Sequence, residues 1–221
     1  MFSEDAKTVE PRRAMVERLK NEGITDRRVL DAMMAVPRHL FIPEDKRQYG
    51  YDPNPVPIGY GQTISSPFIV GSMTSLLEIR PGDKILEIGT GCGYQTAVLC
   101  ELGAKVVTIE LLPEVMQMAS ANLAGLGCDV KFKTGDGYNG WPEEALFDGC
   151  IVAATAPRIP EPLVEQLATG GRIVIPVREG PGVEMLIRGT RESTGLRIER
   201  LYQVIFVPMK GIIENQQAKE N

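Results

Sequence analysis

The stretch from Asp83 to Tyr94, Asp-Lys-Ile-Leu-Glu-Ile-Gly-Thr-Gly-Cys-Gly-Tyr, constrains the fold of this chain more than any other. Its first half predicts a short buried strand over Lys84–Ile88, and the residues from Tyr94 to Leu102 predict a helix. The glycines between them permit positive φ and let a ligand approach the backbone closely. Because the helix also begins with unpaired N–H groups, this turn predicts a binding site for a polar ligand.

Glycine spacing and two acidic residues distinguish between two classes of nucleotide cofactor. Dinucleotide-binding enzymes use G-x-G-x-x-G, which places a pyrophosphate on the helix N-terminus. Here the spacing is G-x-G-x-G, and Glu87 precedes the first glycine by two residues, where it would repel a pyrophosphate and suit an ammonium or sulfonium. About 20 residues further on, the apolar run Lys105–Ile109 ends in Glu110, which is placed to accept both ribose hydroxyls. The pattern favours S-adenosylmethionine, and a plain βα turn is the weaker alternative.

After Pro81-Gly82, strand-like and helix-like segments alternate along the chain. The further segments are a helix over 113–124, strands over 129–134 and 147–154, a helix over 159–168 and a strand over 172–177. This alternation predicts an α/β fold with a doubly wound, mostly parallel sheet and right-handed crossovers. Two late runs, Val183–Thr190 and Tyr202–Pro208, are predicted to form a C-terminal antiparallel hairpin. Together these features are typical of a Rossmann-like methyltransferase.

The first part of the chain is predicted to be helical. Residues 12–21 carry apolar side chains at helical spacing, and Thr25-Asp26 is placed to cap a second helix. His39 follows as the only histidine of the chain, so multi-histidine metal sites are excluded. A structural role is favoured for this histidine.

Residues 48–62 are rich in Tyr, Pro and Gly. This composition excludes a regular helix or an interior strand and predicts a long ordered loop. A helix is then expected over 68–79, with Pro67 in its first turn and Ser65 or Ser66 as its N-cap.

Composition indicates a single globular domain of 221 residues, with 43% hydrophobic and 24% charged residues. We expect residues 1–82 to form N-terminal helices and a substrate-side loop, residues 83–211 the cofactor-binding sheet, and residues 212–221 a disordered polar tail. The net charge of −5 disfavours a nucleic-acid partner. The four cysteines lack zinc-binding spacing, and no apolar run approaches the ~18 residues of a membrane span. With no signal peptide, we expect free thiols in a cytoplasmic monomer without metal.

The segment Gly135–Trp141 follows a predicted strand, at the edge where open α/β sheets bind ligands. Its Asp136 is placed to accept a hydrogen bond from an adenine amino group. A plain turn role for this aspartate is the alternative.

Five stretches of this chain resemble the protein-L-isoaspartate O-methyltransferase family. They are Val36-Pro-Arg-His-Leu-Phe-Ile-Pro43, Gly61-Gln-Thr-Ile-Ser-Ser-Pro67, Ile85-Leu-Glu-Ile-Gly-Thr-Gly-Cys-Gly-Tyr94, Gly135-Asp-Gly-Tyr-Asn-Gly-Trp-Pro142 and Gly170-Gly-Arg-Ile-Val-Ile-Pro176. The glycine turn is common to many methyltransferases, whereas the Thr-Ile-Ser-x-Pro stretch is far more specific. The resemblance implies repair of damaged proteins and peptides by transfer of a methyl group from S-adenosylmethionine to the free carboxylate of L-isoaspartyl residues. The product of the cofactor is S-adenosylhomocysteine, and D-aspartyl residues are a further candidate substrate.

The resemblance also implies the roles of individual residues. Ser65 corresponds to the residue usually assigned as active, and the resemblance implies that the cleft for cofactor and substrate is lined by the cofactor-binding residues Gln62, Thr63, Ile64 and Ser65. The residues that resemble the family's cofactor site are Glu87, Gly89, Thr90, Gly91, Glu110, Asp136 and Gly137. Some members carry a histidine after Thr-Ile-Ser-x-Pro, where this chain has Phe68-Ile69-Val70, so that contact is not carried over. Met209-Lys210-Gly211 shows no clear match to the C-terminal cofactor contacts of the family and is left out of the predicted site.

The implied reaction requires alignment more than proton transfer. A side-chain carboxylate with a pKa around 4 is already ionised at pH 7, so no general base is needed. The loop Tyr49–Gly61 and the run Val204–Pro208 are predicted to form a peptide-binding wall that reads the substrate main chain. Alternatives are a methyltransferase for small molecules or RNA, a nicotinamide dehydrogenase, and an adenosine-binding module without activity.

Overall fold

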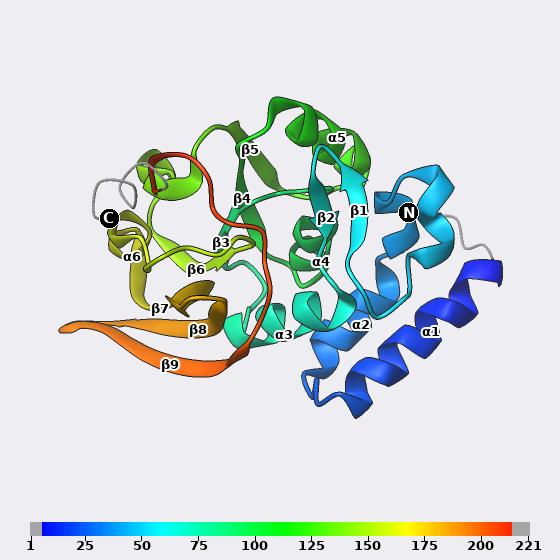
Figure 1. Cartoon of the computed structure of the whole chain (residues 1–221), viewed down its shortest axis with the longest axis horizontal. Coiled ribbons are helices and arrows are strands. Elements are labelled where there is room, and N and C mark those ends of the chain that lie inside the picture. Colours follow the sequence, from blue (N-terminus) through cyan, green and yellow to red (C-terminus); the bar gives the residue numbers. More distant parts are fainter. Residues whose placement is uncertain (1–5, 214–221) are drawn as a thin grey trace.

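A computed structural model of the chain describes residues 6–213, which are organised around a seven-stranded sheet (Figure 1). The strand order is β5-β4-β3-β6-β7-β8-β9. The parallel strands are β3 (Lys84–Ile88), β4 (Lys105–Glu110), β5 (Val130–Thr134), β6 (Phe147–Val152) and β7 (Leu167–Gly180). β8 (Val183–Glu192) pairs antiparallel with β7, and β9 (Gly195–Gln203) pairs antiparallel with β8 at the end of the sheet. The doubly wound sheet with a C-terminal hairpin confirms the predicted fold class.

Hydrophobic side chains pack on both faces of the sheet, because successive residues of a strand point to opposite sides. In β3, Ile85 belongs to one buried cluster and Leu86 to the other. The first cluster is shared with the helices α1 (Ala6–Asn21), α2 (Arg27–Ala35), α3 (Pro67–Leu77) and α4 (Tyr94–Glu101). The other helices are α5 (Pro113–Leu123) and the short α6 (Glu161–Glu165). α1 and α2 lie at one end of the molecule and the β8–β9 hairpin at the other (Figure 1).

Local capping rules correctly predict where two helices begin. Asp26 is the N-cap of α2, and its carboxylate accepts hydrogen bonds from Arg28 N at 2.9 Å and Val29 N at 3.4 Å. Ser66 is the N-cap of α3, where its hydroxyl accepts from Ile69 N at 3.3 Å. These bonds satisfy amide groups that a helix leaves without internal partners. Ser65, one residue earlier, is therefore not needed for the cap.

The predicted loop over 48–62 contains more regular structure than expected. A short 3-10 helix, η2 (Glu44–Tyr49), enters it, and a separate antiparallel hairpin ends it, formed by β1 (Val56–Gly59) and β2 (Gln62–Ile64). Pro57 is tolerated because a two-stranded ribbon has only edge strands. The prediction of one long ordered loop is thus wrong for the hairpin strands, while the exclusion of an interior strand holds.

Two predictions near the C-terminus are also corrected. The helix expected over 159–168 is limited to α6, and β7 already begins at Leu167. The partner of β8 is β9, which shares only Tyr202 and Gln203 with the predicted run Tyr202–Pro208. The charged residues of β9, such as Arg197 and Glu199, conceal the alternation that normally signals a strand, because much of this hairpin faces solvent.

The polar tail predicted after Gly211 falls largely on residues 214–221, which lie outside the described residues. The division of the chain at residues 82 and 83 remains a prediction. Across residues 6–213, no helix combines the length and apolar character needed to cross a bilayer.

Candidate active site

The glycine turn follows β3 at the carboxyl edge of the sheet, as the sequence predicts. Gly91 adopts a φ of 56° and Gly93 a φ of 87°, a region that other residues seldom occupy. A side chain at Gly93 would also meet the Leu123 side chain at 3.0 Å. The turn therefore depends on glycine both for its backbone path and for the close approach of α5.

Glu87 lies beneath this turn and is completely buried. Its Oε2 atom accepts hydrogen bonds from the Thr96 hydroxyl at 2.6 Å and the Thr108 hydroxyl at 2.8 Å. Its Oε1 atom has no partner among the described residues. Burial raises the pKa of Glu87 to about 7, while the two threonine hydrogen bonds act in the opposite direction. A buried carboxylate oxygen without a partner suits a cationic ligand in the cleft. The site therefore fits a cofactor that carries a sulfonium and an ammonium group.

Glu110 ends β4 opposite the glycine turn and connects the two. One carboxylate oxygen accepts from Gly91 N at 3.0 Å, and the other accepts from Leu112 N at 3.1 Å. The side chain is 7% exposed and lines both of the cavities described below. Each carboxylate oxygen has a further lone pair, so these bonds leave room for the predicted ribose contact.

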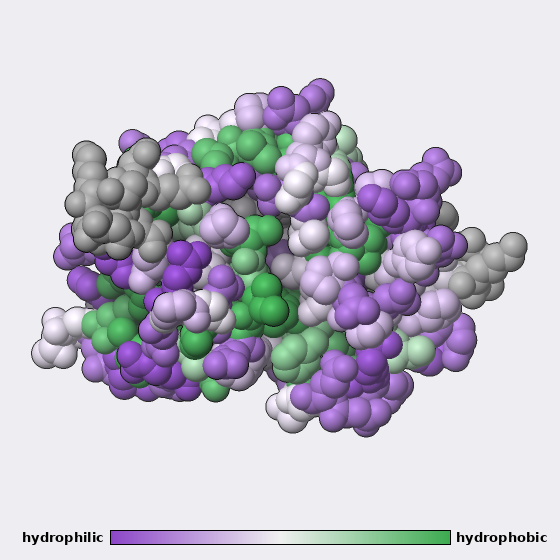
Figure 2. Space-filling view, in the orientation of Figure 1, coloured by the Kyte–Doolittle hydropathy of each residue, from purple (hydrophilic) through white to green (hydrophobic). Residues whose placement is uncertain are grey.

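Two adjoining cavities run along this edge of the sheet. The first is lined by Gln62, Thr63, Ile64, Ser65, Glu87, Gly89, Thr90, Gly91 and Glu110, and the second by Gln62, Gly89, Glu110 and Gly137 among others. Every predicted site residue except Asp136 therefore lines one cavity or both. Figure 2 shows a hollow near the centre of this face, with hydrophobic surface beside it.

Asp136 is held by backbone groups instead. Its Oδ1 atom accepts from Tyr138 N at 2.9 Å, which caps the 3-10 helix η3 (Gly137–Asn139). Its Oδ2 atom accepts from Ile212 N at 2.7 Å. This is the turn role that the sequence left as the alternative, with an additional bond to the C-terminal part of the chain. The adenine contact stays a prediction.

The predicted cofactor site omitted a segment that closes the second cavity. We call residues 204–213 the C-terminal strap; it crosses the carboxyl edge of the sheet after β9 (Figure 1). The cavity is lined by strap residues Val207, Pro208, Met209 and Lys210. Val204–Pro208 was predicted to be a strand of the peptide-binding wall, and Met209-Lys210-Gly211 matched no family motif, so the apolar character of the run was the one available signal.

Thr155 and Glu184 anchor the strap. Thr155 N donates to Val207 O at 2.9 Å, and Met209 N donates to Thr155 O at 2.8 Å. The carboxylate of Glu184 accepts from Phe206 N at 2.9 Å and from the Thr155 hydroxyl at 2.8 Å. With the Asp136 bond, these contacts hold the strap at both ends of the second cavity.

Comparison with known proteins identifies the family to which this chain belongs. The model of the family described as Protein-L-isoaspartate(D-aspartate) O-methyltransferase (PCMT) matches residues 10–214. The chain belongs to this family. A PCMT relative from Nitrosococcus oceani, protein-L-isoaspartate O-methyltransferase 2, is 51% identical over 84% of this chain and 85% of its own length. A protein-L-isoaspartate O-methyltransferase from Gloeobacter violaceus is 45% identical over 87% of this chain and 95% of its own length.

Solved structures agree with the PCMT assignment. A protein-L-isoaspartate O-methyltransferase superposes with a TM-score of 0.86 at 25% identity, covering 95% of this chain and 69% of that chain. A beta-aspartate methyltransferase (PCMT) structure from Plasmodium falciparum, in complex with S-adenosyl-L-homocysteine, has a TM-score of 0.79 at 28% identity, covering 90% and 98%. These matches confirm the predicted family, fold class and methyltransferase activity, with S-adenosylmethionine as the family's methyl donor.

Proposed function

We propose that this PCMT chain is a protein-repair methyltransferase that uses S-adenosylmethionine to methylate the free carboxylate of L-isoaspartyl residues in damaged proteins and peptides. D-aspartyl residues are a further candidate substrate. The observation that carries the proposal is the first cavity, which joins the unpartnered oxygen of Glu87 to the Ser65 segment. A site for a cation and a site for an anion thus share one space. When bound there, the cofactor supplies a methyl group on a positively charged sulfur.

Ser65 is the residue that we assign to the substrate carboxylate. It is partly buried, lies directly after β2, and lines the first cavity. Its carbonyl oxygen accepts a hydrogen bond from Arg38 at 2.7 Å, so removal of the hydroxyl leaves the backbone anchor in place. Because the carboxylate is already ionised at pH 7, the contribution of Ser65 is orientation rather than proton abstraction.

The cofactor is assigned to the glycine turn and its flanking acids. Glu87 is proposed to face the cationic end and Glu110 the ribose. Thr90 shares a 2.7 Å hydroxyl–hydroxyl contact with Thr108, which connects the turn to the donors of Glu87. Gly137 is required where it stands, because a Cβ there would lie 2.3 Å from the Ile88 side chain.

A peptide methylation assay tests the function and the role of Ser65 together. Labelled S-adenosylmethionine is incubated with matched peptides that differ only in an L-isoaspartyl or L-aspartyl residue. We expect label in the isoaspartyl peptide alone, and a roughly 10- to 150-fold lower kcat for Ser65→Ala, because a hydrogen bond to a charged group contributes about 1.5–3 kcal/mol. Binding of S-adenosylhomocysteine should be nearly unchanged. Ser193→Ala, at an exposed turn, is the control.

Other outcomes would identify the competing functions. Full turnover by Ser65→Ala would remove Ser65 from the mechanism. Cofactor binding without label in either peptide would indicate an adenosine-binding module or a different methyl acceptor, and tight NADH binding would indicate a dehydrogenase.

The peptide-binding wall is proposed to consist of the β1–β2 hairpin and the strap. Tyr60, at the tip of the hairpin, is 60% exposed, and Ile205 of the strap is 94% exposed. Exposed apolar side chains beside free backbone edges suit an extended peptide that is recognised through its main chain. Replacing Tyr60 by glycine, which accommodates its φ of 54°, should raise KM for the isoaspartyl peptide while cofactor affinity is retained, because Tyr60 lines neither cavity. An unchanged peptide KM would count against this wall.

We further propose a cytoplasmic monomer that forms one domain and uses neither nucleic acid nor a membrane as a partner. The four cysteines, none of which is paired in a disulfide, fit a reducing compartment. Sedimentation analysis at micromolar concentration tests the monomer.

A further inference from the structure

Arg38 is the largest fully buried side chain among the described residues, and it touches three separate segments. It begins the 3-10 helix η1 (Arg38–Phe41). Its Nε atom donates to Gly50 O at 2.9 Å, and its Nη2 atom donates to Ser65 O at 2.7 Å. Its guanidinium carbon lies 5.0 Å from the centre of the Tyr94 ring. One side chain therefore connects the loop before the hairpin, the Ser65 segment and the start of α4.

The surroundings of Arg38 do not include a compensating negative charge. Within residues 6–213, no carboxylate forms an ion pair with it, and its buried Nη1 atom has no partner. Burial accordingly lowers the pKa of the guanidinium, although neighbouring Tyr94 and Cys92 act in the opposite direction. Burying an unpaired cation is unfavourable for stability, and an apolar residue of similar volume is often the more stable choice. The position of Arg38 therefore calls for an explanation beyond filling the core.

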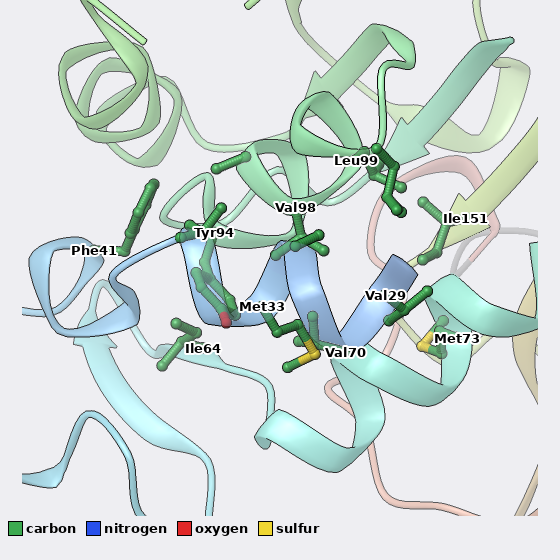
Figure 3. Close-up of a cluster of buried hydrophobic side chains, with 14 of the residues drawn as sticks. Val29, Met33, Phe41, Ile64, Val70, Met73, Tyr94, Val98, Leu99 and Ile151 are labelled. Atoms are coloured by element: carbon green, nitrogen blue, oxygen red, sulfur yellow. The ribbon is translucent and has the colours of Figure 1, made fainter. Parts of the chain in front are cut away.

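Tyr94 relates Arg38 to the cofactor side of the cleft. It is the first residue of α4, directly after Gly93, and it lines the first cavity. Its ring also contacts Phe41 of η1 edge-on, with centroids 5.6 Å apart. Figure 3 shows Tyr94 extending from α4 toward Met33, with Phe41 and Ile64 nearby. The guanidinium thus packs against the glycine turn while it holds the carbonyl of Ser65.

We propose that Arg38 is a positioning residue for methyl transfer, which fixes the Ser65 segment relative to the glycine turn. The inference rests on the role of Ser65 proposed above. In-line transfer tolerates little displacement, and an error of about 1 Å can reduce a rate by ~100-fold. The planar fork of arginine holds two carbonyls in fixed directions and stacks on an aromatic ring, which the point charge of lysine does not reproduce.

A double-mutant cycle between Arg38→Lys and Ser65→Ala tests this role. Because Arg38 acts through the position of the Ser65 hydroxyl, Arg38→Lys should lower kcat by about tenfold in the wild-type background. In the Ser65→Ala background the same change should lower kcat by less than about twofold, because the group being positioned is already absent. The dissociation constant of S-adenosylhomocysteine should change by less than about twofold in each variant, since Arg38 lines neither cavity.

A merely structural arginine would give different results. If the losses in kcat multiply, or if cofactor affinity falls in parallel with kcat, the positioning role is wrong. Ile173→Ala is the matched control, because Ile173 is fully buried in the other core cluster and lies on β7, none of whose residues lines either cavity, so its truncation destabilises the fold away from the cleft. It should lower the Tm while kcat stays unchanged, and a fall in kcat there would show that lost stability alone explains the Arg38 result.

A second variant covers the case in which Arg38→Lys does not fold. A Cβ at Gly50 would meet His39 at 3.0 Å, so Gly50→Ala should displace the carbonyl that holds Nε without altering the guanidinium. We expect a roughly two- to fivefold lower kcat that again disappears in the Ser65→Ala background. Full activity would contradict the inference. If Ser65→Ala itself keeps full turnover, the proposed role of Ser65 fails instead, and the two failures are distinguishable.

Discussion

Cofactor binding should release a proton from Glu87 when the pH is below about 7. Burial raises the pKa of this carboxyl group to about 7 in the cleft, against the hydrogen bonds from Thr96 and Thr108. Its Oε1 atom has no partner among the residues described. A cation next to that oxygen favours the ionised form, so binding lowers the pKa and expels the proton.

The size of the effect follows from the pKa. At pH 6 a group with a pKa of about 7 is roughly nine-tenths protonated, so apparent cofactor affinity should fall by about tenfold for each pH unit below 7. The number of protons released on binding should be about 0.9 at pH 6 and about 0.5 at pH 7. Measurements at or below pH 7 keep the amino group of the cofactor protonated, because its ordinary pKa is about 8.

The same shift affects stability in the absence of cofactor. A carboxyl group whose folded pKa is raised contributes stability below the unfolded value of 4.5, and this contribution is lost as the pH rises through about 7. The difference of about 2.5 pH units amounts to about 3 kcal/mol, so Glu87→Gln should stabilise the cofactor-free protein at pH 8 by up to that amount. Cofactor affinity of this variant should nevertheless be weaker at pH 7.5, where the wild-type carboxylate is largely ionised.

Calorimetric titration with S-adenosylhomocysteine, in buffers of different ionisation enthalpy, measures proton release directly. Thermal unfolding from pH 5 to pH 8 measures the stability difference. Glu143→Gln, which removes one exposed negative charge, is the matched control and should change neither result. A wild-type binding enthalpy that is independent of buffer at pH 6 would refute the reasoning, as would equal proton release by Glu87→Gln.

Further predictions concern the strap and the ribose contact. Gly211 has a φ of 101°, and a Cβ there would lie 2.2 Å from Asp136 Oδ2, so Gly211→Ala should displace the strap and weaken S-adenosylhomocysteine binding by roughly tenfold in calorimetry. Gly180→Ala, where a Cβ has open space, should bind normally, and equal losses would exclude a specific strap effect. Glu110→Gln should weaken binding by roughly 10- to 100-fold, because it removes a charge-assisted ribose contact and one of the acceptors near Gly91. With the 2′-deoxy ligand this loss should shrink; an undiminished loss would show that Glu110 acts only on the turn.

Features set by local chemistry were predictable from the sequence. The bounds of β3 match the prediction because five consecutive residues form a buried parallel strand that glycine ends. Asp26 and Ser66 cap their helices because short oxygen-bearing side chains satisfy the first free amides. The positions of Glu87 and Glu110 were also predictable, because their distances along the chain from the glycine turn place both residues at one edge of the sheet.

Features set by contacts between distant segments were not predictable. Nothing near Asp136 in the sequence indicates that Ile212 N will occupy one of its oxygens, 76 residues away. The Arg38 side chain reaches Ser65 across 27 residues and gives no periodic signal. Val204–Pro208 crosses the carboxyl edge of the sheet as part of the strap and is not a strand of the sheet, although its apolar residues resemble one. In each case a long-range contact decides what a local pattern leaves open.

Glu87 and Arg38 are buried charged residues, each with one polar atom that has no partner within residues 6–213, on the cofactor side and the substrate side of the Ser65 segment. Their effects on cofactor affinity and on kcat can be separated by pH. Glu87 titrates near neutral pH, whereas the Arg38 guanidinium stays protonated throughout. At saturating cofactor, the loss of kcat in Gly50→Ala should therefore be equal at pH 6 and pH 8, because this variant keeps the guanidinium and changes only its geometry. The effect of Glu87→Gln on cofactor affinity should instead be small at pH 6 and large at pH 7.5, because only an ionised carboxylate attracts the cation. A pH-dependent Gly50→Ala defect would mean that the two charges act on the same step.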